Sequence, residues 1–262
     1  MQVKTLSTSR YNSINAVAYV APSGTTRAIF GYGYTTANVS MTNLVSSTGV
    51  VATDTTGVGT ARQSPGAATY GTDKAIFGYG YSSVQVSMTN LVSNTGVVAT
   101  DTTGVGTARF HSPAAGYGTD KAIFGYGTTN GNTDTSVTNL VSNTGVVATD
   151  TTGVGTARQR LAAAGYGTDK AIFVYGGNYN VSITNLVSNT GVVSGDSTGI
   201  GTYRLGLGGS GYGNDKAIVA YGFDGSNRSM SNLISNTGII ATDTTGVGSA
   251  RYNVAAAGYS TT

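Results

Sequence analysis

The stretch TGVVATDTTGVGTAR decides the fold, because it occurs three times without a change, at residues 48–62, 95–109 and 144–158. Altered copies follow at residues 190–204 and 237–251. The arginines that close successive copies are 47, 49, 46 and 47 residues apart. A fixed period of this length is typical of architectures that repeat one small structural unit. Five copies predict five units.

Each unit is expected to hold four short strands. In the second copy these are residues 67–70, 74–79, 84–92 and 97–101, which are rich in Val, Ile, Phe and Tyr. The segments GTDK and SNTG between them suit hairpin turns, since Gly supplies positive φ and Asp and Asn bond locally to the backbone. No window has a sustained helical period. The pattern predicts an all-β domain whose units have the size of a propeller blade.

The unit also resembles the kelch repeat. Arg62, the apolar run AIFGYG at 75–80 and the polar turn SNTG at 93–96 match that family's order of Arg, strand ending in glycines, and turn. The family's Gly-Gly doublet is Gly-Tyr-Gly in three units, and its Trp is absent. The resemblance covers nearly the whole chain and implies a single five-bladed β-propeller. The near-identical units and the Gly, Thr, Asn and Tyr texture are also similar to propeller modules of bacteriophage virion proteins.

Two segments compete for the first strand of the first blade. Residues 15–20 precede the first unit, whereas residues 254–259 (VAAAGY) follow the last one and match the repeat better. We expect the C-terminal segment to close the ring, because closure removes open sheet edges. Residues 1–20 would then form an N-terminal arm, and residues 21–262 the propeller. In the alternative, residues 15–20 are the true first strand.

Composition excludes several classes of function. Only 10% of the 262 residues are charged, against roughly 25% in ordinary domains. The net charge of +3 is spread along the chain, so nucleic-acid binding is not expected. There is no Cys, hence no disulfide framework or thiolate metal site. We expect neither a membrane span nor a signal peptide, and therefore a virion or otherwise cytoplasmic location.

Most charged residues recur in every unit, which favours a structural role at the blade junctions, where paired charges can be buried. A ring of charge around an axial channel, able to hold an ion or a sugar, is the alternative. The recurring arginines and strand aspartates are Arg62, Arg109, Arg158, Arg204, Arg251, Asp54, Asp101, Asp150, Asp196 and Asp243.

The residue inventory predicts that the chain is not an enzyme and carries no cofactor. There is no Glu, and only Asp134 and Asp224 lie outside the repeat, on different blades. The single histidine, His111, lies in the loop-like FHSP at 110–113, which has no nucleophile elbow and favours a surface residue. One His without Cys cannot build a transition-metal site. The same lack of Cys and of further His residues also excludes the copper chemistry known on kelch-type propellers.

The variable loops all fall on one side of the predicted disc. In an up-and-down blade, the connection into the first strand and the loop after the second strand share a face. These are the segments that differ between copies, and they predict a recognition face on a rigid scaffold. Drift in unconstrained loops is the alternative. The candidate residues are Tyr34, Tyr81, His111, Asn130, Asn132, Asp134, Arg160, Asn178, Tyr179, Phe223, Asp224 and Arg228.

Two functions follow as hypotheses. The first is a non-catalytic structural or attachment module, such as a bacteriophage tail, head-decoration or fibre component. Its arm would bind other virion or surface proteins. The second is a multivalent carbohydrate-binding lectin with shallow sites between blades, in which several weak glycan sites gain avidity.

Overall fold

The computed structural model describes residues 27–177 and 182–258. Their strands form five small antiparallel sheets, and the helical content of this part of the chain is the single 3-10 turn η1, Asn130–Asn132. The prediction of an all-β protein is therefore confirmed. Each sheet corresponds to one sequence repeat, and the sheets are called units 1 to 5 below.

The first unit has two strands and the other four have three. Unit 1 pairs β1 (Ala28–Tyr34) with β2 (Asn38–Val45). The other sheets take their strands in chain order, with the middle one central. They are β3 (Gly66–Tyr70), β4 (Lys74–Gly78) and β5 (Thr89–Val92); β6 (Ala114–Tyr117), β7 (Lys121–Gly125) and β8 (Thr138–Val141); β9 (Ala162–Tyr166), β10 (Lys170–Val174) and β11 (Thr184–Val187); and β12 (Gly208–Tyr212), β13 (Lys216–Phe223) and β14 (Asn227–Ile234).

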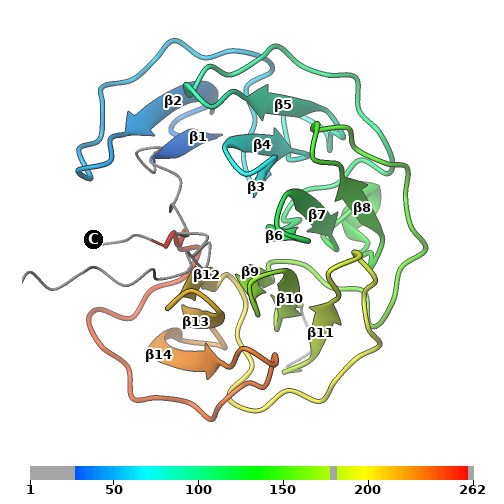
Figure 1. The fold of residues 1–262 in the computed structure, drawn as a ribbon, viewed down its shortest axis with the longest axis vertical. Helices are drawn as coiled ribbons and strands as arrows, with labels where there is room; N and C mark the ends of the chain where they lie inside the picture. Colours follow the sequence, from blue (N-terminus) through cyan, green and yellow to red (C-terminus); the bar gives the residue numbers. More distant parts are fainter. Residues whose placement is uncertain (1–26, 178–181, 259–262) are drawn as a thin grey trace, which may run out of the picture.

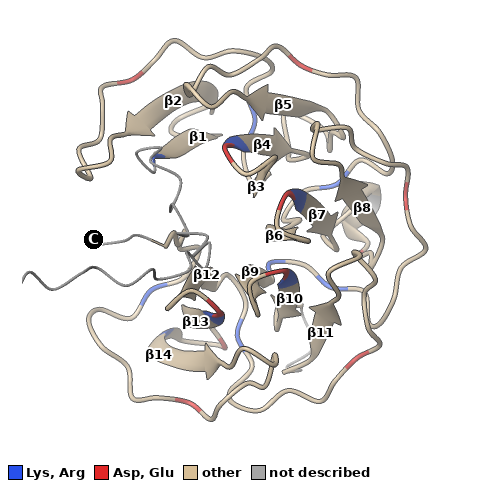
Figure 2. Ribbon diagram, in the orientation of Figure 1, with Lys and Arg blue, Asp and Glu red and all other residues tan. Residues whose placement is uncertain are grey.

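The five sheets lie around a common centre and form an open arc (Figure 1). The first strands β3, β6, β9 and β12 are innermost and neighbour one another in turn. The long connections between units run along the outer rim. Aspartates are on this rim, and Asp–Lys pairs occupy the inner turns (Figure 2). The buried apolar residues form four clusters, each between two neighbouring sheets, so the core is divided among the junctions.

The predicted fourth strand is not a regular strand. The segment expected at 97–101 pairs with β5 only through isolated bridges, Val92 with Val98 and Thr89 with Thr102. The same pair of bridges recurs in every unit. The sheets therefore have two or three strands instead of four. The segment sits at the edge of its sheet and bends along the rim, which leaves it two contact points.

The predicted ring closure is also not found in the described residues. β1 pairs only with β2, and residues 254–258 form no strand. A Cβ atom on Gly208 would contact Val254, and a Cβ atom on Gly258 would contact the Gly211 carbonyl oxygen. Residues 254–258 therefore pack against β12. The segment thus continues the series of inner strands beyond unit 5 without reaching unit 1. The predicted arm, residues 1–20, lies outside the described residues.

A tyrosine with a left-handed backbone directly follows β4, β7 and β10 and lies near the end of β1 and β13. The φ angles of Tyr32, Tyr79, Tyr126, Tyr175 and Tyr221 lie between 53° and 63°. This conformation costs a non-glycine residue about 1 kcal/mol or more. In units 1 and 5, where pairing resumes beyond the tyrosine, it produces a register shift. At Tyr79, Tyr126 and Tyr175 the kink directs the carbonyl toward the arginine of the preceding junction. The ring of the same tyrosine packs against the arginine of the following junction.

Residues of adjacent middle strands that face each other across a junction are matched in size. A Cβ on Gly125 would lie 2.6 Å from Phe173 Cζ of the next unit, and the equivalent atom on Gly78 would lie 2.7 Å from Phe124. Between units 4 and 5 the glycine is replaced by Val174, and the residue across from it is the smaller Val219. Glycine therefore occurs where the neighbour is Phe, and valine where the neighbour is Val.

This matching predicts strong coupling between Gly125 and Phe173. Gly125→Val should cost about 3 kcal/mol by overpacking, and Phe173→Val roughly 2 kcal/mol by leaving a void. The double variant reproduces the Val174–Val219 pair and should be more stable than the sum of the two losses by about 1 kcal/mol or more. Urea denaturation of all four proteins measures this coupling. Strictly additive losses would contradict the matching.

Candidate functional site

A buried arginine fills each of the four internal junctions. Arg62, Arg109, Arg158 and Arg204 are 0–1% exposed. Arg109, for example, donates from Nε to the Tyr126 carbonyl at 2.9 Å, from Nη1 to the Thr107 carbonyl at 3.0 Å and from Nη2 to Asn139 Oδ1 at 2.7 Å. The three other arginines make the same three bonds. A buried cation is thus supplied with oxygen partners on all sides, as its desolvation requires.

The preceding unit contributes an aromatic platform to the same junction. The Arg109 guanidinium lies 4.0 Å from the ring centroid of Tyr79, and Phe124 packs edge-on against that ring at 5.1 Å. Tyr79 also donates from its hydroxyl to the Val105 carbonyl at 3.2 Å. Stacking of a cation on a desolvated tyrosine face contributes about 1 to 2 kcal/mol. One tyrosine therefore joins two successive units.

The strand aspartates join the network through asparagine. Asn139 donates from Nδ2 to Asp150 Oδ1 at 2.9 Å, and Thr107 donates from Oγ1 to Asp150 Oδ2 at 2.6 Å. Partial burial would raise the pKa of Asp150, but the bonds from Thr107 and Asn139, together with the charge of Arg109, lower it below its usual value. At the three other internal junctions the direct approach between the arginine and the aspartate is long, at 3.4 to 3.9 Å. The main partner of the arginine is the asparagine.

Sequence reasoning identified the arginines and aspartates but missed the asparagines and tyrosines of this network. The recurring Asn-Leu pair gave the signal, since a polar residue repeated within an apolar strand calls for a buried partner. Arg251 is the exception among the arginines. It is exposed, lies 3.8 Å from the Tyr221 ring centroid and donates to the Ser249 carbonyl.

The structure places the two sets of variable loops together on one face. Gln63 bridges to Tyr81, Phe110 to Thr128, and Leu205 to Phe223. In unit 4, the Gly177 amide donates to the Gln159 carbonyl at 2.7 Å. Each connection into a unit therefore pairs with the loop that follows the same unit's middle strand. This shared face is called the loop face below.

Part of the predicted residue set forms an aromatic cluster on the loop face. The rings of Tyr81 and Phe110 lie 5.6 Å apart, and those of Phe110 and His111 lie 4.2 Å apart. His111 Nδ1 is 3.0 Å from Gln159 Oε1, and Arg160 lies beside it. All three rings are partly exposed. Burial lowers the pKa of His111 to about 4, so the ring is neutral at pH 7.

Other predicted residues are separate from this cluster. Asp224 and Arg228 pair with each other, with Nε 2.8 Å from both carboxylate oxygens, and Phe223 packs against Tyr252 at 5.4 Å. Asp134 accepts from Thr128, and burial raises its pKa. Tyr34 is exposed at the end of β1, and Asn130 and Asn132 are exposed in η1. Asn178 and Tyr179 lie outside the described residues.

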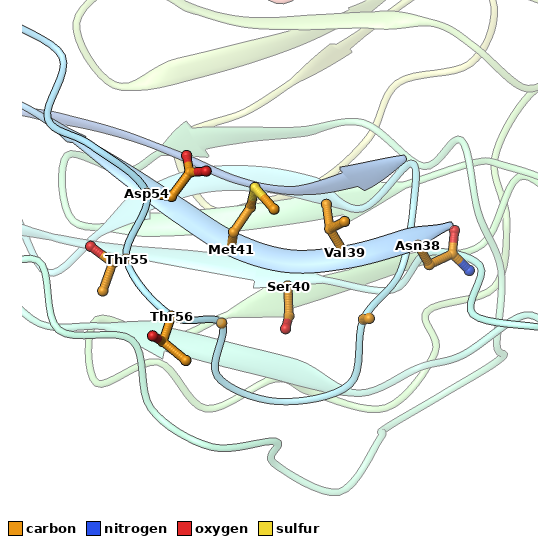
Figure 3. A pocket seen from close by; sticks show the side chains of 9 residues that line it. Asn38, Val39, Ser40, Met41, Asp54, Thr55 and Thr56 are labelled. Atoms are coloured by element: carbon orange, nitrogen blue, oxygen red, sulfur yellow. The ribbon is translucent and has the colours of Figure 1, made fainter. Parts of the chain in front are cut away.

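A shallow groove of about 400 Å³ lies on the rim of unit 1 (Figure 3). Its lining comes from β2 and from the rim segment that follows, and it includes Val39, Met41 and Thr55. Asp54 is the single titratable side chain among the lining residues. A groove with one carboxylate lacks the second acid or base that paired acid–base chemistry needs.

Comparison with known proteins gives no relative: neither a protein-family model nor a curated protein sequence matches this chain. Among the described residues, no group of three or more His, Cys, Asp or Glu side chains could hold a metal ion. Within the same residues, no helix has the length and apolar character needed to span a membrane.

Removal of a junction arginine should be costly at an internal junction and nearly harmless at the end of the arc. Arg109→Met leaves Asn139 and the Tyr126 carbonyl buried without their donor, and we expect a loss of about 3 kcal/mol or more in the free energy of unfolding. Arg251→Met is the matched control, with an expected change within about 0.5 kcal/mol. Urea denaturation at low protein concentration compares them. Equal losses in the two variants would show that burial of the arginine does not determine its contribution to the free energy of unfolding.

Acidification should destabilise the protein through His111. Its pKa in the folded chain lies below the ordinary 6.5, so the unfolded chain binds more protons between about pH 6.5 and 4. Stability is complete above pH 6.5 and falls by roughly 2 to 3 kcal/mol as the pH drops to about 4. His111→Asn should remove this loss, because Asn253 occupies the equivalent left-handed position of the last repeat. Thermal melts of both proteins at pH 7 and 4.5 test the difference.

Proposed function

We propose that the chain is a non-catalytic attachment module whose five units are the blades of a propeller-like disc and whose loop face binds a surface ligand. The observation that carries the proposal is that the recurring charged residues and the variable residues lie in different parts of the structure. The recurring charges bond to one another and to the backbone inside the junctions, whereas the residues that vary between units gather on one face. A rigid body with one variable face is the design of a binding scaffold.

The backbone of the loop face supports this proposal. The connections into successive units bond to one another: the Arg160 amide donates to His111, Gly206 to Arg160 and Asn253 to Gly206, over 2.8 to 3.3 Å. Ser64, His111, Arg160, Gly206 and Asn253 share a φ between 53° and 65°. Five different side chains are therefore carried on one backbone conformation. Such a face can change its chemistry without changing its shape.

The setting that we propose for this module is the bacteriophage virion, on the likeness of its near-identical units to virion propeller modules. The loop face would meet a host surface or a neighbouring subunit. Residues 1–20 would tether the module to other virion proteins.

A carbohydrate ligand is the second candidate, and the cluster of Tyr81, Phe110 and His111 favours it. Neutral aromatic rings offer apolar faces to the C–H groups of a sugar ring, and Gln159 and Arg160 supply hydrogen-bonding groups next to them. The cluster occurs once among the described units, and the pair of Phe223 and Tyr252 is a second, different arrangement. We therefore expect one or two dissimilar sugar sites per chain instead of five equal ones.

Binding to bacterial cells and to a glycan array tests both candidates. The labelled protein is compared with Tyr81→Ser, Phe110→Ser and a variant whose residues 128–135 are replaced by a Gly-Ser linker. The matched control is Val146→Ser, which changes an exposed residue of the turn after β8, away from the loop face. An attachment module should lose cell binding at least tenfold in one or more loop-face variants and keep it in the control.

The array separates the two candidates. Binding to a defined glycan that is lost on Tyr81→Ser or Phe110→Ser identifies a lectin. Cell binding without any glycan signal indicates a protein ligand. Absence of cell binding, or binding that only Val146→Ser weakens, would contradict a ligand site on the loop face.

A further inference from the structure

The internal junctions are built from two complementary halves. The earlier unit supplies what we call the tail half; at the junction between units 2 and 3 this is Tyr70, Tyr79, Leu91, Thr107 and Arg109. The later unit supplies the head half, there made of Phe124, Asn139, Gly145 and Asp150. Leu91 and Tyr70 pack on Gly145, where a Cβ would lie 2.8 and 3.0 Å from them. The bonds described above join the remaining residues.

The first unit presents a head half with no neighbour among the described residues. Phe30 is 52% exposed, whereas its equivalents Phe77, Phe124 and Phe173 are at most 4% exposed. A Cβ on Gly49 would meet nothing within 4 Å, although Gly96, at the same place in unit 2, touches Leu44. Among the described residues, the sheet β1–β2 also has no inner strand of the kind found in units 2 to 5.

The last unit presents the matching tail half. Tyr212 is 40% exposed, whereas its equivalents at the internal junctions are at most 4% exposed. Leu233 is 42% exposed, whereas its equivalents there are partly buried. Arg251 is exposed but already stacks on Tyr221, as the internal arginines stack on their tyrosines. Ser249 occupies the position of Thr107, which donates to the strand aspartate at an internal junction.

The two open halves match in charge, and in size except where Ala220 replaces the glycine that faces Phe at the first three junctions. Repetition of the internal contacts would direct Arg251 to Asn43 and Ser249 to Asp54, whose carboxylate accepts only from Asn43 among the described residues. Phe30 would meet Tyr221 and the small Ala220, which stands where Gly78 faces Phe124. Leu233 and Tyr212 would cover Gly49. Residues 254–258, which already lie beside β12, would supply an inner strand next to β1 of the second copy.

Within the described residues, the two halves do not meet. They lie in the first and last sheets of the arc, and no described strand lies between them (Figure 1). The internal junctions share one set of contacts, with the Tyr–Phe centroid distances of the first three at 5.0 to 5.2 Å. The tail half of unit 5 has the residue types for one more contact of this set. We propose that a second copy of this chain supplies the head half, so that the tail of one copy binds the head of the next.

Light scattering across a concentration series tests this head-to-tail contact in the full chain. The mass of the unaltered protein should rise above the 26.3 kDa of one chain as concentration increases. Asp54→Arg blocks the head and Arg251→Asp blocks the tail, so each variant alone should remain at one chain. An equimolar mixture should associate again, because the intact tail of the first variant binds the intact head of the second and the two substituted ends carry opposite charges. Variants of the loop face should associate like the unaltered protein.

Each alternative gives a different result. Closure of the ring within a chain, or occupation of the head by residues 1–26, would keep the unaltered protein and the mixture at one chain and would overturn the proposal. Association that survives both single changes would place the interface elsewhere and overturn it too. The double variant Asp54→Arg with Arg251→Asp carries both changes in one chain and should recover association, which shows that neither substitution acts by unfolding the protein.

Discussion

The structure depends on the burial of one guanidinium group at each junction. A charge removed from water must have every donor paired, and three different segments meet this demand around Arg109. The tyrosine before it gives a ring face, the next tyrosine gives a carbonyl, and the asparagine of the third strand gives an amide oxygen. The left-handed φ of the tyrosine follows from this requirement, because a regular strand would keep its carbonyl in the ladder. The kink at this tyrosine is therefore part of the junction.

The same network explains why variation between units is confined to the loop face. A change at Asn139 or Tyr126 would leave a buried cation without a partner, so these positions are fixed in every repeat. The left-handed position in the connections is different, since Ser, His, Arg, Gly and Asn all occupy it with nearly the same φ. There the backbone amide makes the contact to the previous connection and the side chain is free to differ. The side chains at these positions can therefore vary the binding chemistry, while the backbone bonds and the junction network keep the body rigid.

The sequence predicted the elements that local patterns encode. The inner strand 162–166 and the middle strands beginning at Lys74, Lys121 and Lys170 lie where the apolar runs and the Gly-Thr-Asp-Lys turns indicated. Three features depended on partners distant in the chain and were missed. The outer segment at 97–101 has strand composition, but its place at the rim gives it only isolated bridges. The hydrogen bond from the arginine to the asparagine and the stacking of the arginine on the tyrosine could not be predicted without knowing which units are in contact. His111 has the loop context of a surface residue, yet neighbouring loops half-bury it and lower its pKa.

The ends of a repeat array differ from its interior in one physical respect, which is that half an interface stays in water. Terminal repeats commonly replace their apolar junction residues with polar ones for this reason. Unit 1 and unit 5 have not done so: Phe30, Tyr212 and Leu233 retain the residue types of the buried positions, and Arg251 and Asp54 retain their charges. Exposed apolar side chains that are rimmed by polar groups mark interaction sites more often than accidents. Because the residues that seal an internal junction are present at both ends, no new chemistry is needed to extend the array from one chain to another.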